Sequence, residues 1–467
     1  MPRRRARRIA IAAALLLLAF TRPWAPGTFA VSPPAPAPMN VVLFIIDDVR
    51  WDAIGAAGNP VVRTPRIDQL AADGVRFRQA RVTTSICMVS RTTLLTGQYM
   101  SRHGITEFGK ALTPEAFAQT FPGTLRRAGY WTGHVGKYDV GPPRPQDYDF
   151  LRAYHGRHWI QEADGTRVHV TEKNARDSLE FLRARPKDRP FVLSVGYFAA
   201  HAEDDAKEQY LPQDWSAKPY AGVTIPPPLH GDPKYQQALP PFLSDERNEG
   251  RVRYHWRFDT PDSYQAYMTR YYRLITEVDD AIGRLVDELK AQGVYENTLI
   301  VFIGDNGYFQ ADRGLADKWY PYEESDRVPL VVRDPRLPAG RRGMTRDEFA
   351  LNLDVAPTIV SAAGLPIPAG MQGQNLAPLY LQAKAPAWRD EFFYEHPTVT
   401  RKERIPSSQG VIRRDWKYID WPEYGYQQLF DLRSDPGEIR NLIADPASQR
   451  MATQMRLKLD EWRARVR

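Results

Sequence analysis

Four candidate strands are spaced along the first two thirds of the chain, at residues 40–46, 130–136, 191–197 and 299–303. The first reads Asn-Val-Val-Leu-Phe-Ile-Ile and has no alternating polar positions, which is typical of a strand buried on both faces of a sheet. Each strand is followed closely by an ionisable side chain, namely Asp47, Lys137, His201 or Asp305. Because ligands of open α/β sheets bind beyond the carboxyl ends of the strands, we expect these side chains to meet in one polar site. The pattern predicts an α/β fold with a large, mostly parallel or mixed sheet flanked by helices.

Two segments between these strands show helical signals. Residues 264–292 carry apolar side chains on one stripe and predict a long amphipathic helix, with the Asp279–Asp280 pair on its solvated face. A shorter helix is predicted after Thr64, which is its expected N-cap, and it ends at Gly74.

One long segment lacks clean periodicity. Residues 210–261 are rich in proline and aromatic residues. Long irregular insertions are usually functional loops or disordered segments. We interpret this one as the wall of a substrate pocket.

The pattern changes in the last quarter of the chain. Three segments alternate apolar and polar positions like antiparallel strands, at residues 391–395, 410–420 and 427–432. Residues 448–465 predict a terminal helix. We therefore predict a catalytic domain over residues 39–375 and a C-terminal α+β subdomain over residues 376–467.

The N-terminus has the three parts of an export signal. Five of the first eight residues are arginine, residues 9–20 form an apolar run, and residues 28–30 offer a small-residue cleavage site. The apolar run is short for a membrane span. We predict a signal peptide over residues 1–30 and a Pro-rich linker over residues 31–38. The protein is then exported, periplasmic or secreted, with no stable membrane span after cleavage; an uncleaved anchor is the alternative.

The composition is ordinary for a globular protein of 467 residues, with 43% hydrophobic and 25% charged residues. A single cysteine excludes an internal disulfide framework. The formal net charge of +7 comes from scattered basic residues without a nucleic-acid-binding motif, so we expect no nucleic-acid partner. A mildly positive surface suits an anionic substrate.

Two polar pairs stand where metal ligands are expected. Asp47-Asp48 follows the first strand, and Asp305-Asn306 follows the fourth. Adjacent buried carboxylates repel each other unless a cation balances them. These oxygen donors suit a hard cation, calcium before magnesium. Asp52 extends the first pair to Asp-Asp-x-x-x-Asp, and from these residues alone a solvated turn is an equal alternative.

The only cysteine, Cys87, lies within residues 85–97. Arg91 follows it by four residues, so a helix beginning near Cys87 places both side chains on one face, with a partly exposed thiol at the helix N-terminus. A lone cysteine is often only a small buried apolar residue. This segment, however, resembles the signature of the type I sulfatase family, Cys-x-Pro-x-Arg followed by a spacer and Thr-Gly. The matching residues are Cys87, Ser90, Arg91, Thr96 and Gly97, and Val89 stands where the family usually has proline, sometimes alanine.

The resemblance runs from about residue 40 to residue 442 and implies an alkaline-phosphatase-like sandwich that hydrolyses sulfate monoesters of a small molecule or glycan. In this family the formylglycine-generating machinery oxidises the cysteine to formylglycine, and a calcium ion is bound. Carried over to this sequence, the metal ligands are Asp47, Asp48, Cys87 in its oxidised form, Asp305 and Asn306. The implied catalytic residues are Cys87, Arg91, Lys137, His201 and Lys318. Arg91 would hold the oxidised side chain, and Lys137 would bridge it and the sulfate. Lys318 and His201 would grip the sulfate, and one of them would help to protonate the leaving oxygen.

The chain departs from the family next to Lys137. The family often has a histidine two residues after this lysine, where this chain has Asp139. Either another base serves, with His134 and His201 as the candidates, or turnover differs from that of the family. Two rival functions stay open. The first is a phosphonate or phosphodiester hydrolase that uses the same aldehyde nucleophile. The second is a non-catalytic binder of sulfated glycans in which Cys87 stays a thiol.

Overall fold

The computed structural model describes residues 38–154 and 156–467. The predicted signal peptide and all but the last residue of the predicted linker lie outside these ranges. No helix within them has the length and apolar character needed to cross a membrane.

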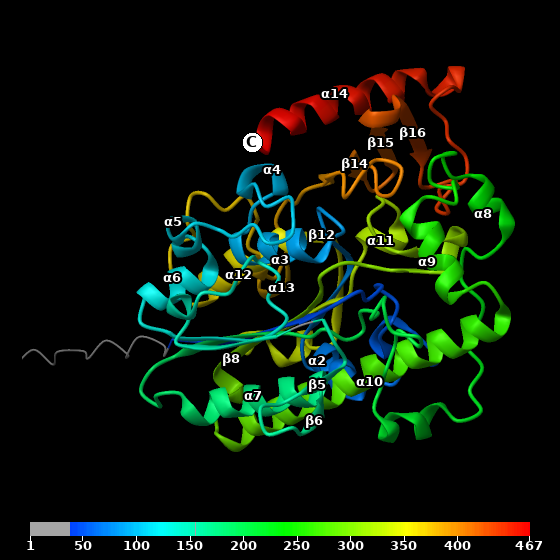
Figure 1. Ribbon diagram of the computed structural model, residues 1–467. Coiled ribbons are helices and arrows are strands. Elements are labelled where there is room, and N and C mark those ends of the chain that lie inside the picture. Colours follow the sequence, from blue (N-terminus) through cyan, green and yellow to red (C-terminus); the bar gives the residue numbers. More distant parts are fainter. Residues whose placement is uncertain (1–37, 155) are drawn as a thin grey trace, which may run out of the picture. The chain divides into compact units, whose positions relative to one another are not determined.

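One eight-stranded sheet crosses the protein in the order β12-β2-β11-β8-β1-β7-β3-β4 (Figure 1). Its strands are β1 (Asn40–Ile46), β2 (Val75–Arg81), β3 (Trp131–Gly136), β4 (Phe150–Ala153), β7 (Phe191–Gly196), β8 (Thr298–Gly304), β11 (Leu330–Arg333) and β12 (Met344–Leu351). The four strands expected from the sequence are β1, β3, β7 and β8, and they are parallel neighbours at the centre of the sheet. Because β11 runs antiparallel to both of its neighbours, the sheet is mixed. The predicted α/β fold is confirmed.

Helices cover both faces of this sheet (Figure 1). One face packs against α2 (Pro65–Asp73), α7 (Val170–Ala184) and α10 (Pro261–Ala291), and the other packs against α3 (Cys87–Thr96), α6 (Phe121–Arg127) and α12 (Val355–Ala362). Because side chains alternate along a strand, β1 supplies Phe44 to the first apolar core and Leu43 to the second. The result is a three-layer α/β/α sandwich.

Shorter elements fill the connections. The helices among them are α4 (Met100–His103), α5 (Pro114–Ala118), α8 (Pro233–Gln237), α9 (Glu249–Arg257), α11 (Glu323–Asp326) and α13 (Ala377–Leu381). Two small antiparallel sheets have two strands each. One pairs β5 (Trp159–Gln161) with β6 (Arg167–His169), and the other pairs β9 (Phe309–Gln310) with β10 (Ala316–Asp317). The insertion at residues 210–261 is less irregular than predicted, since it contains α8, α9 and a 3-10 helix at Asp214–Tyr220.

The C-terminal part forms a separate antiparallel sheet, as predicted, but with four strands instead of three, because residues 410–420 belong to two paired strands. Its strands are β13 (Glu391–His396), β14 (Ser408–Arg413), β15 (Trp416–Trp421) and β16 (Tyr426–Asp431), and the terminal helix α14 (Gln449–Arg465) packs on one face. On the other face, Trp421 and Phe430 belong to the same apolar core as Met88 and Val89 of α3. Residues 38–467 form one compact unit, so the division at residue 375 stays a prediction.

The prediction of a solvated face for Asp279 and Asp280 is wrong for Asp279. Asp280 is exposed, but Asp279 is buried, and its carboxylate accepts hydrogen bonds from the backbone N–H groups of Arg66 and Ile67 in the first turn of α2. The expected cap, Thr64, makes no such side-chain hydrogen bond. The free N–H donors at the start of α2 are therefore satisfied by an acid on α10.

Candidate active site

Two neighbouring strands bring four oxygen-bearing side chains together. Because β1 and β8 are parallel and in register, Asp47 and Asp48 end one strand beside Asp305 and Asn306 at the end of the other. The backbone N–H of Asp48 lies 3.3 Å from Oδ1 of Asp305, and Nδ2 of Asn306 donates to Oδ1 of Asp48 at 2.6 Å. All four side chains are buried. The structure thus joins the two pairs that were expected to hold a metal.

Three oxygens of this cluster are buried without a hydrogen-bond partner among the described residues: Oδ1 of Asp47, Oδ2 of Asp48 and Oδ1 of Asn306. Leaving buried acceptors unpaired costs free energy, so their gathering in one place is informative. Burial raises the pKa of Asp48 and of Asp305 to about 7. A hard divalent cation would satisfy the oxygens and offset the repulsion between carboxylates, so these residues fit calcium or magnesium.

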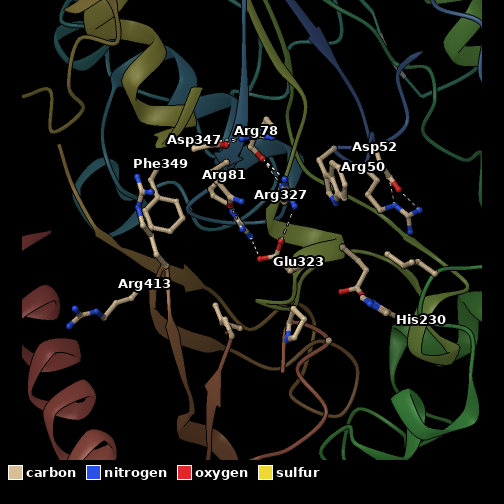
Figure 2. A pocket seen from close by; sticks show the side chains of 18 of the residues that line it. Arg50, Asp52, Arg78, Arg81, His230, Glu323, Arg327, Asp347, Phe349 and Arg413 are labelled. Atoms are coloured by element: carbon tan, nitrogen blue, oxygen red, sulfur yellow. Dashed lines mark hydrogen bonds and ion pairs between the residues drawn. The ribbon is translucent and has the colours of Figure 1, made fainter. Parts of the chain in front are cut away.

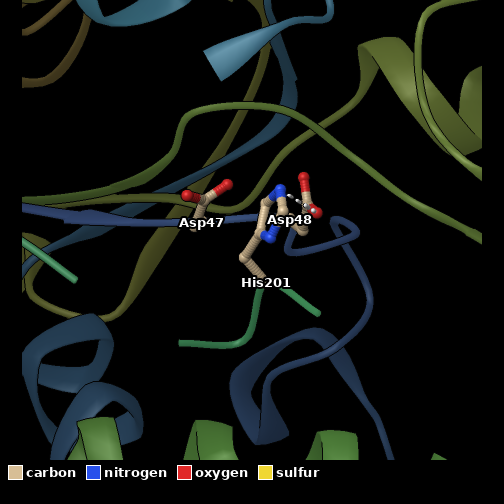
Figure 3. A group of neighbouring side chains, drawn as sticks. All are labelled: Asp47, Asp48 and His201. Carbon is tan, nitrogen blue, oxygen red and sulfur yellow. Dashed lines mark ion pairs between the residues drawn. The ribbon is translucent and has the colours of Figure 1, made fainter. Parts of the chain in front are cut away.

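His201 follows β7 and lies beside Asp48 (Figure 3). Its Nε2 is 3.7 Å from Oδ2 of Asp48, and one ligand atom each of Asp47, Asp48 and His201 lie within 4.8 Å of one another. Nδ1 is 2.7 Å from the carbonyl oxygen of Ala202, so we assign the ring proton to Nδ1. Burial and the nearby Lys318 and Lys137 lower the pKa of His201 to about 4. The imidazole is therefore neutral at pH 7 and presents the lone pair of Nε2 to the cluster.

Two buried lysines each contact one carboxylate of the cluster. Lys137 follows β3, contacts Asp47 and lies 3.1 Å from Oδ2 of Asp139. Lys318 follows β10, contacts Asp48 and lies 3.6 Å from Oδ1 of Asp317. Burial alone would lower the pKa of each lysine, but the carboxylates outweigh burial and raise both pKa values. Both ammonium groups are charged at neutral pH.

Cys87 begins α3, and Arg91 follows one turn later. The Nε of Arg91 donates to Oδ2 of Asp305 at 2.8 Å, and its Nη1 donates to the carbonyl oxygen of Lys137 at 2.7 Å. Cys87 is only 4% exposed, so the expectation of a partly exposed thiol is wrong. Burial raises the pKa of the thiol to about 12. The helix N-terminus and the two lysines favour the thiolate, but their effect on the pKa is smaller than that of burial. An unmodified Cys87 is therefore protonated at neutral pH and is a poor nucleophile.

A pocket of about 340 Å³ opens onto this cluster. Of the nine residues predicted from the sequence, Cys87, Lys137, His201 and Lys318 line it directly, and the others lie behind them. The insertion at residues 210–261 was predicted to form the pocket wall, but it contributes only Arg253 to the lining. Wall residues that the sequence did not suggest are Phe108, Asp204, Val399 and Ile405. These residues come from loops without a recognisable motif.

Two residues weighed from the sequence lie elsewhere. His134, considered as a base, is buried against Tyr138, with ring centroids 5.0 Å apart, and does not line the pocket. Asp52, considered as a third acid of the metal pattern, pairs with Arg50 at 2.5 Å. Of the two candidate bases, only His201 therefore lies at the site.

A larger cavity of about 820 Å³ lies near the edge of the main sheet and the β14–β15 turn (Figure 2). It is lined by several arginines, but Figure 2 shows most of them engaged with acids, as in the pairs Arg78–Asp347, Arg50–Asp52 and Arg327–Glu323. None of the nine predicted residues lines it. The smaller pocket is therefore the candidate active site.

Comparison with solved structures supports the fold. A protein in complex with its substrate D-glucosamine-2-N,6-O-disulfate superposes with a TM-score of 0.77 at 23% identity, over 92% of this chain and 98% of the other. The phosphonate monoester hydrolase of Agrobacterium radiobacter superposes with a TM-score of 0.76 at 23% identity, over 92% and 96%. At this identity the likeness concerns the fold, which is the alkaline-phosphatase-like sandwich expected from the sequence.

Sequence comparison identifies the family. The N-acetylglucosamine-6-O-sulfatase of Bacteroides thetaiotaomicron is 27% identical, over 90% of this chain and 86% of its own length. Residues 311–465 match the family model described as N-sulphoglucosamine sulphohydrolase, C-terminal. Residues 39–365, well over half of the chain, match the sulfatase model. This match shows that the protein is a sulfuric ester hydrolase and that the chain belongs to the sulfatase family.

Proposed function

We propose that this sulfatase removes sulfate from a sulfated carbohydrate, with Cys87 oxidised to formylglycine and a calcium ion in the carboxylate cluster. The observation that carries the proposal is the meeting of two incomplete features in one pocket. Three oxygens of the carboxylate cluster have no hydrogen-bond partner within residues 38–154 and 156–467, and the thiol beside the cluster is protonated at neutral pH. A bound cation would satisfy these oxygens of the carboxylate cluster. Oxidation of Cys87 would replace the protonated thiol with a reactive group.

The cation ligands would be Asp47, Asp48, Asp305 and Asn306, with calcium preferred over magnesium because flexible carboxylates suit its larger shell. When bound, calcium would act as a Lewis acid on a sulfate oxygen. When present, the formylglycine would supply an oxygen nucleophile, which the buried thiol cannot supply. Arg91 would orient the side chain at position 87, because its guanidinium is already fixed by Asp305 and the carbonyl oxygen of Lys137.

The remaining side chains would bind the sulfate and handle protons. Lys137 and Lys318 present charged ammonium groups at the pocket and would hold the sulfate oxygens. Lys318 keeps its protons at neutral pH, whereas His201 is neutral and has none on Nε2. Lys318 is therefore the better placed donor for the leaving oxygen, and His201 accepts hydrogen bonds at Nε2.

A carbohydrate substrate is supported by the pocket and by the relatives. The volume of about 340 Å³ suits a single sugar, and Phe198 and Trp319 offer apolar surface for its C–H groups. One curated relative is named for N-acetylglucosamine 6-sulfate chemistry. We further propose that the protein is exported, with the signal peptide and domain limits expected from the sequence.

The rival activity toward phosphonate esters is favoured by one observation, the superposition with a phosphonate monoester hydrolase. The two activities are separated by parallel assays with calcium, one on N-acetylglucosamine 6-sulfate and one on a phenylphosphonate monoester. We expect inorganic sulfate, measured by ion chromatography, to be released faster than the phosphonate ester is cleaved. Faster cleavage of the phosphonate ester would favour the rival, and binding without any release would favour the non-catalytic binder.

A glycine at the end of β7 makes the geometry of the site testable. A Cβ on Gly196 would lie 2.2 Å from the carbonyl oxygen of Lys137 and 2.6 Å from Nη1 of Arg91. Gly196→Ala is therefore expected to displace both residues and to lower kcat/KM by about tenfold or more. Overpacking should also cost about 1–3 kcal/mol of stability, which chemical denaturation would measure. Gly340→Ala is the control, because nothing lies within 4 Å of its added Cβ. Equal effects of the two substitutions would contradict the geometry.

A further inference from the structure

Asp139 is a pocket residue to which the proposed chemistry gives no role. It lies three residues beyond β3, and its side chain is 11% exposed and lines the pocket with Cys87 and Lys137. Its backbone is in the left-handed region, with φ of 51°, which costs free energy for a residue other than glycine. Strained residues are kept where the surrounding structure holds them, often at functional sites.

The other pocket carboxylates are held mainly by arginines, and Asp317 also lies 3.6 Å from Nζ of Lys318. Asp204 and Asp317 each pair with both Arg253 and Arg257, and Arg257 is fully buried. Asp139 differs, because its one ion pair among the described residues is with Lys137, and Lys137 also contacts Asp47. Because Asp47 is a ligand of the proposed cation, Asp139 is the carboxylate beside Lys137 whose charge that cation does not offset.

Asp139 carries this charge at neutral pH. Burial alone would raise its pKa, but Lys137 and Arg91 outweigh burial, and the pKa is lowered. Its carboxylate oxygen lies 3.1 Å from the ammonium group that would hold the sulfate. An ester bound at Lys137 would therefore lie within a few ångströms of a fixed negative charge, at a range where Coulomb energies are large.

The charge of the ester then decides how well it is tolerated. A sulfate monoester carries one negative charge, whereas a phosphate monoester carries about two at pH 8. We propose that Asp139 is a specificity-determining residue, whose carboxylate limits the positive charge around Lys137 and so selects monoanionic esters over dianionic ones. This inference rests on the proposed placement of the sulfate at Lys137. It also allows a phosphonate monoester, which is a monoanion, as a second substrate.

Asp139→Asn is the matched substitution. Asparagine keeps the size of the side chain and, like aspartate, adopts the left-handed backbone more readily than other residues, so the loop should stay in place. Asp139→Glu keeps the charge and serves as the conservative variant. Asp205→Asn removes an equal charge outside the pocket, at a side chain that is 68% exposed and paired with Arg157.

The measurement is kcat/KM for 4-nitrophenyl sulfate and 4-nitrophenyl phosphate at pH 8, with calcium, and thermal unfolding to check the fold. In Asp139→Asn we expect the ratio of phosphate-ester to sulfate-ester kcat/KM to rise by about tenfold or more. In Asp139→Glu and Asp205→Asn the ratio should stay close to that of the wild type. An unchanged ratio in folded Asp139→Asn, or an equal rise in Asp205→Asn, would overturn the inference. If the wild type hydrolyses no sulfate ester, the proposed function fails instead.

Discussion

Cys87→Ala is expected to abolish turnover, lowering kcat by on the order of a thousandfold or more, because alanine cannot be converted into the nucleophile. The fold should survive. Only one sulfur atom is lost from the start of α3, and Arg91 keeps its partners Asp305 and the carbonyl oxygen of Lys137. Release of inorganic sulfate and thermal unfolding measure the two effects.

Met88→Leu is the matched control for this substitution. Met88 is the next residue of α3 and packs against the C-terminal sheet instead of lining the pocket. A swap of similar volume should cost less than about 1.5 kcal/mol and leave turnover close to that of the wild type. Substantial sulfate release by folded Cys87→Ala would remove Cys87 from the mechanism.

The second large effect is expected from Asp48→Asn. One buried oxygen of Asp48 has no hydrogen-bond partner in the part of the chain that the structure describes, and Asp48 also contacts Lys318. The substitution therefore removes a charged ligand from the proposed cation. Calcium affinity should fall by about a hundredfold or more, and turnover should fall with it. Asparagine also suits the backbone of Asp48, whose φ is 51°, so the loss should not reflect unfolding. Elemental analysis after dialysis measures the calcium content.

Asp52→Asn is the control for the proposed metal site. Asp52 pairs with Arg50 and lies outside the carboxylate cluster, so its replacement should leave the calcium stoichiometry unchanged. If Asp48→Asn binds as much calcium as the wild type, the metal site has been placed wrongly.

The centre of the fold and of the site could be predicted from the sequence for one physical reason. A strand buried on both faces must be apolar throughout, so β1 and β8 are visible as apolar runs. Parallel strands end at the same edge of a sheet, so the residues that follow them meet. Asp47, Lys137, His201 and Asp305 were therefore recognisable before their contacts were known. Arg91 and Lys318 required the resemblance to a family.

What the sequence did not reveal depends on contacts between distant segments. Asp279 sits on an amphipathic helix, and only the docking of α2 turns it into a buried cap. Arg253 reaches the pocket from α9, and Val399 reaches it from the C-terminal part, with no motif around either residue. Cys87 is also buried where distant segments meet, in a pocket that Val399 and Ile405 of the C-terminal part help to line. Periodicity shows which face of an element is polar, but not what later covers that face.

The central claim is that the side chain at position 87 is an oxidised group facing a metal-bound sulfate, not a thiol. The most direct test is mass spectrometry of the tryptic peptide spanning residues 82–91, from active protein made in its native host. We predict the mass in which the CH₂–SH group of Cys87 is replaced by an aldehyde, together with reactivity toward a hydrazide probe. An unmodified cysteine in protein that releases sulfate would contradict the account.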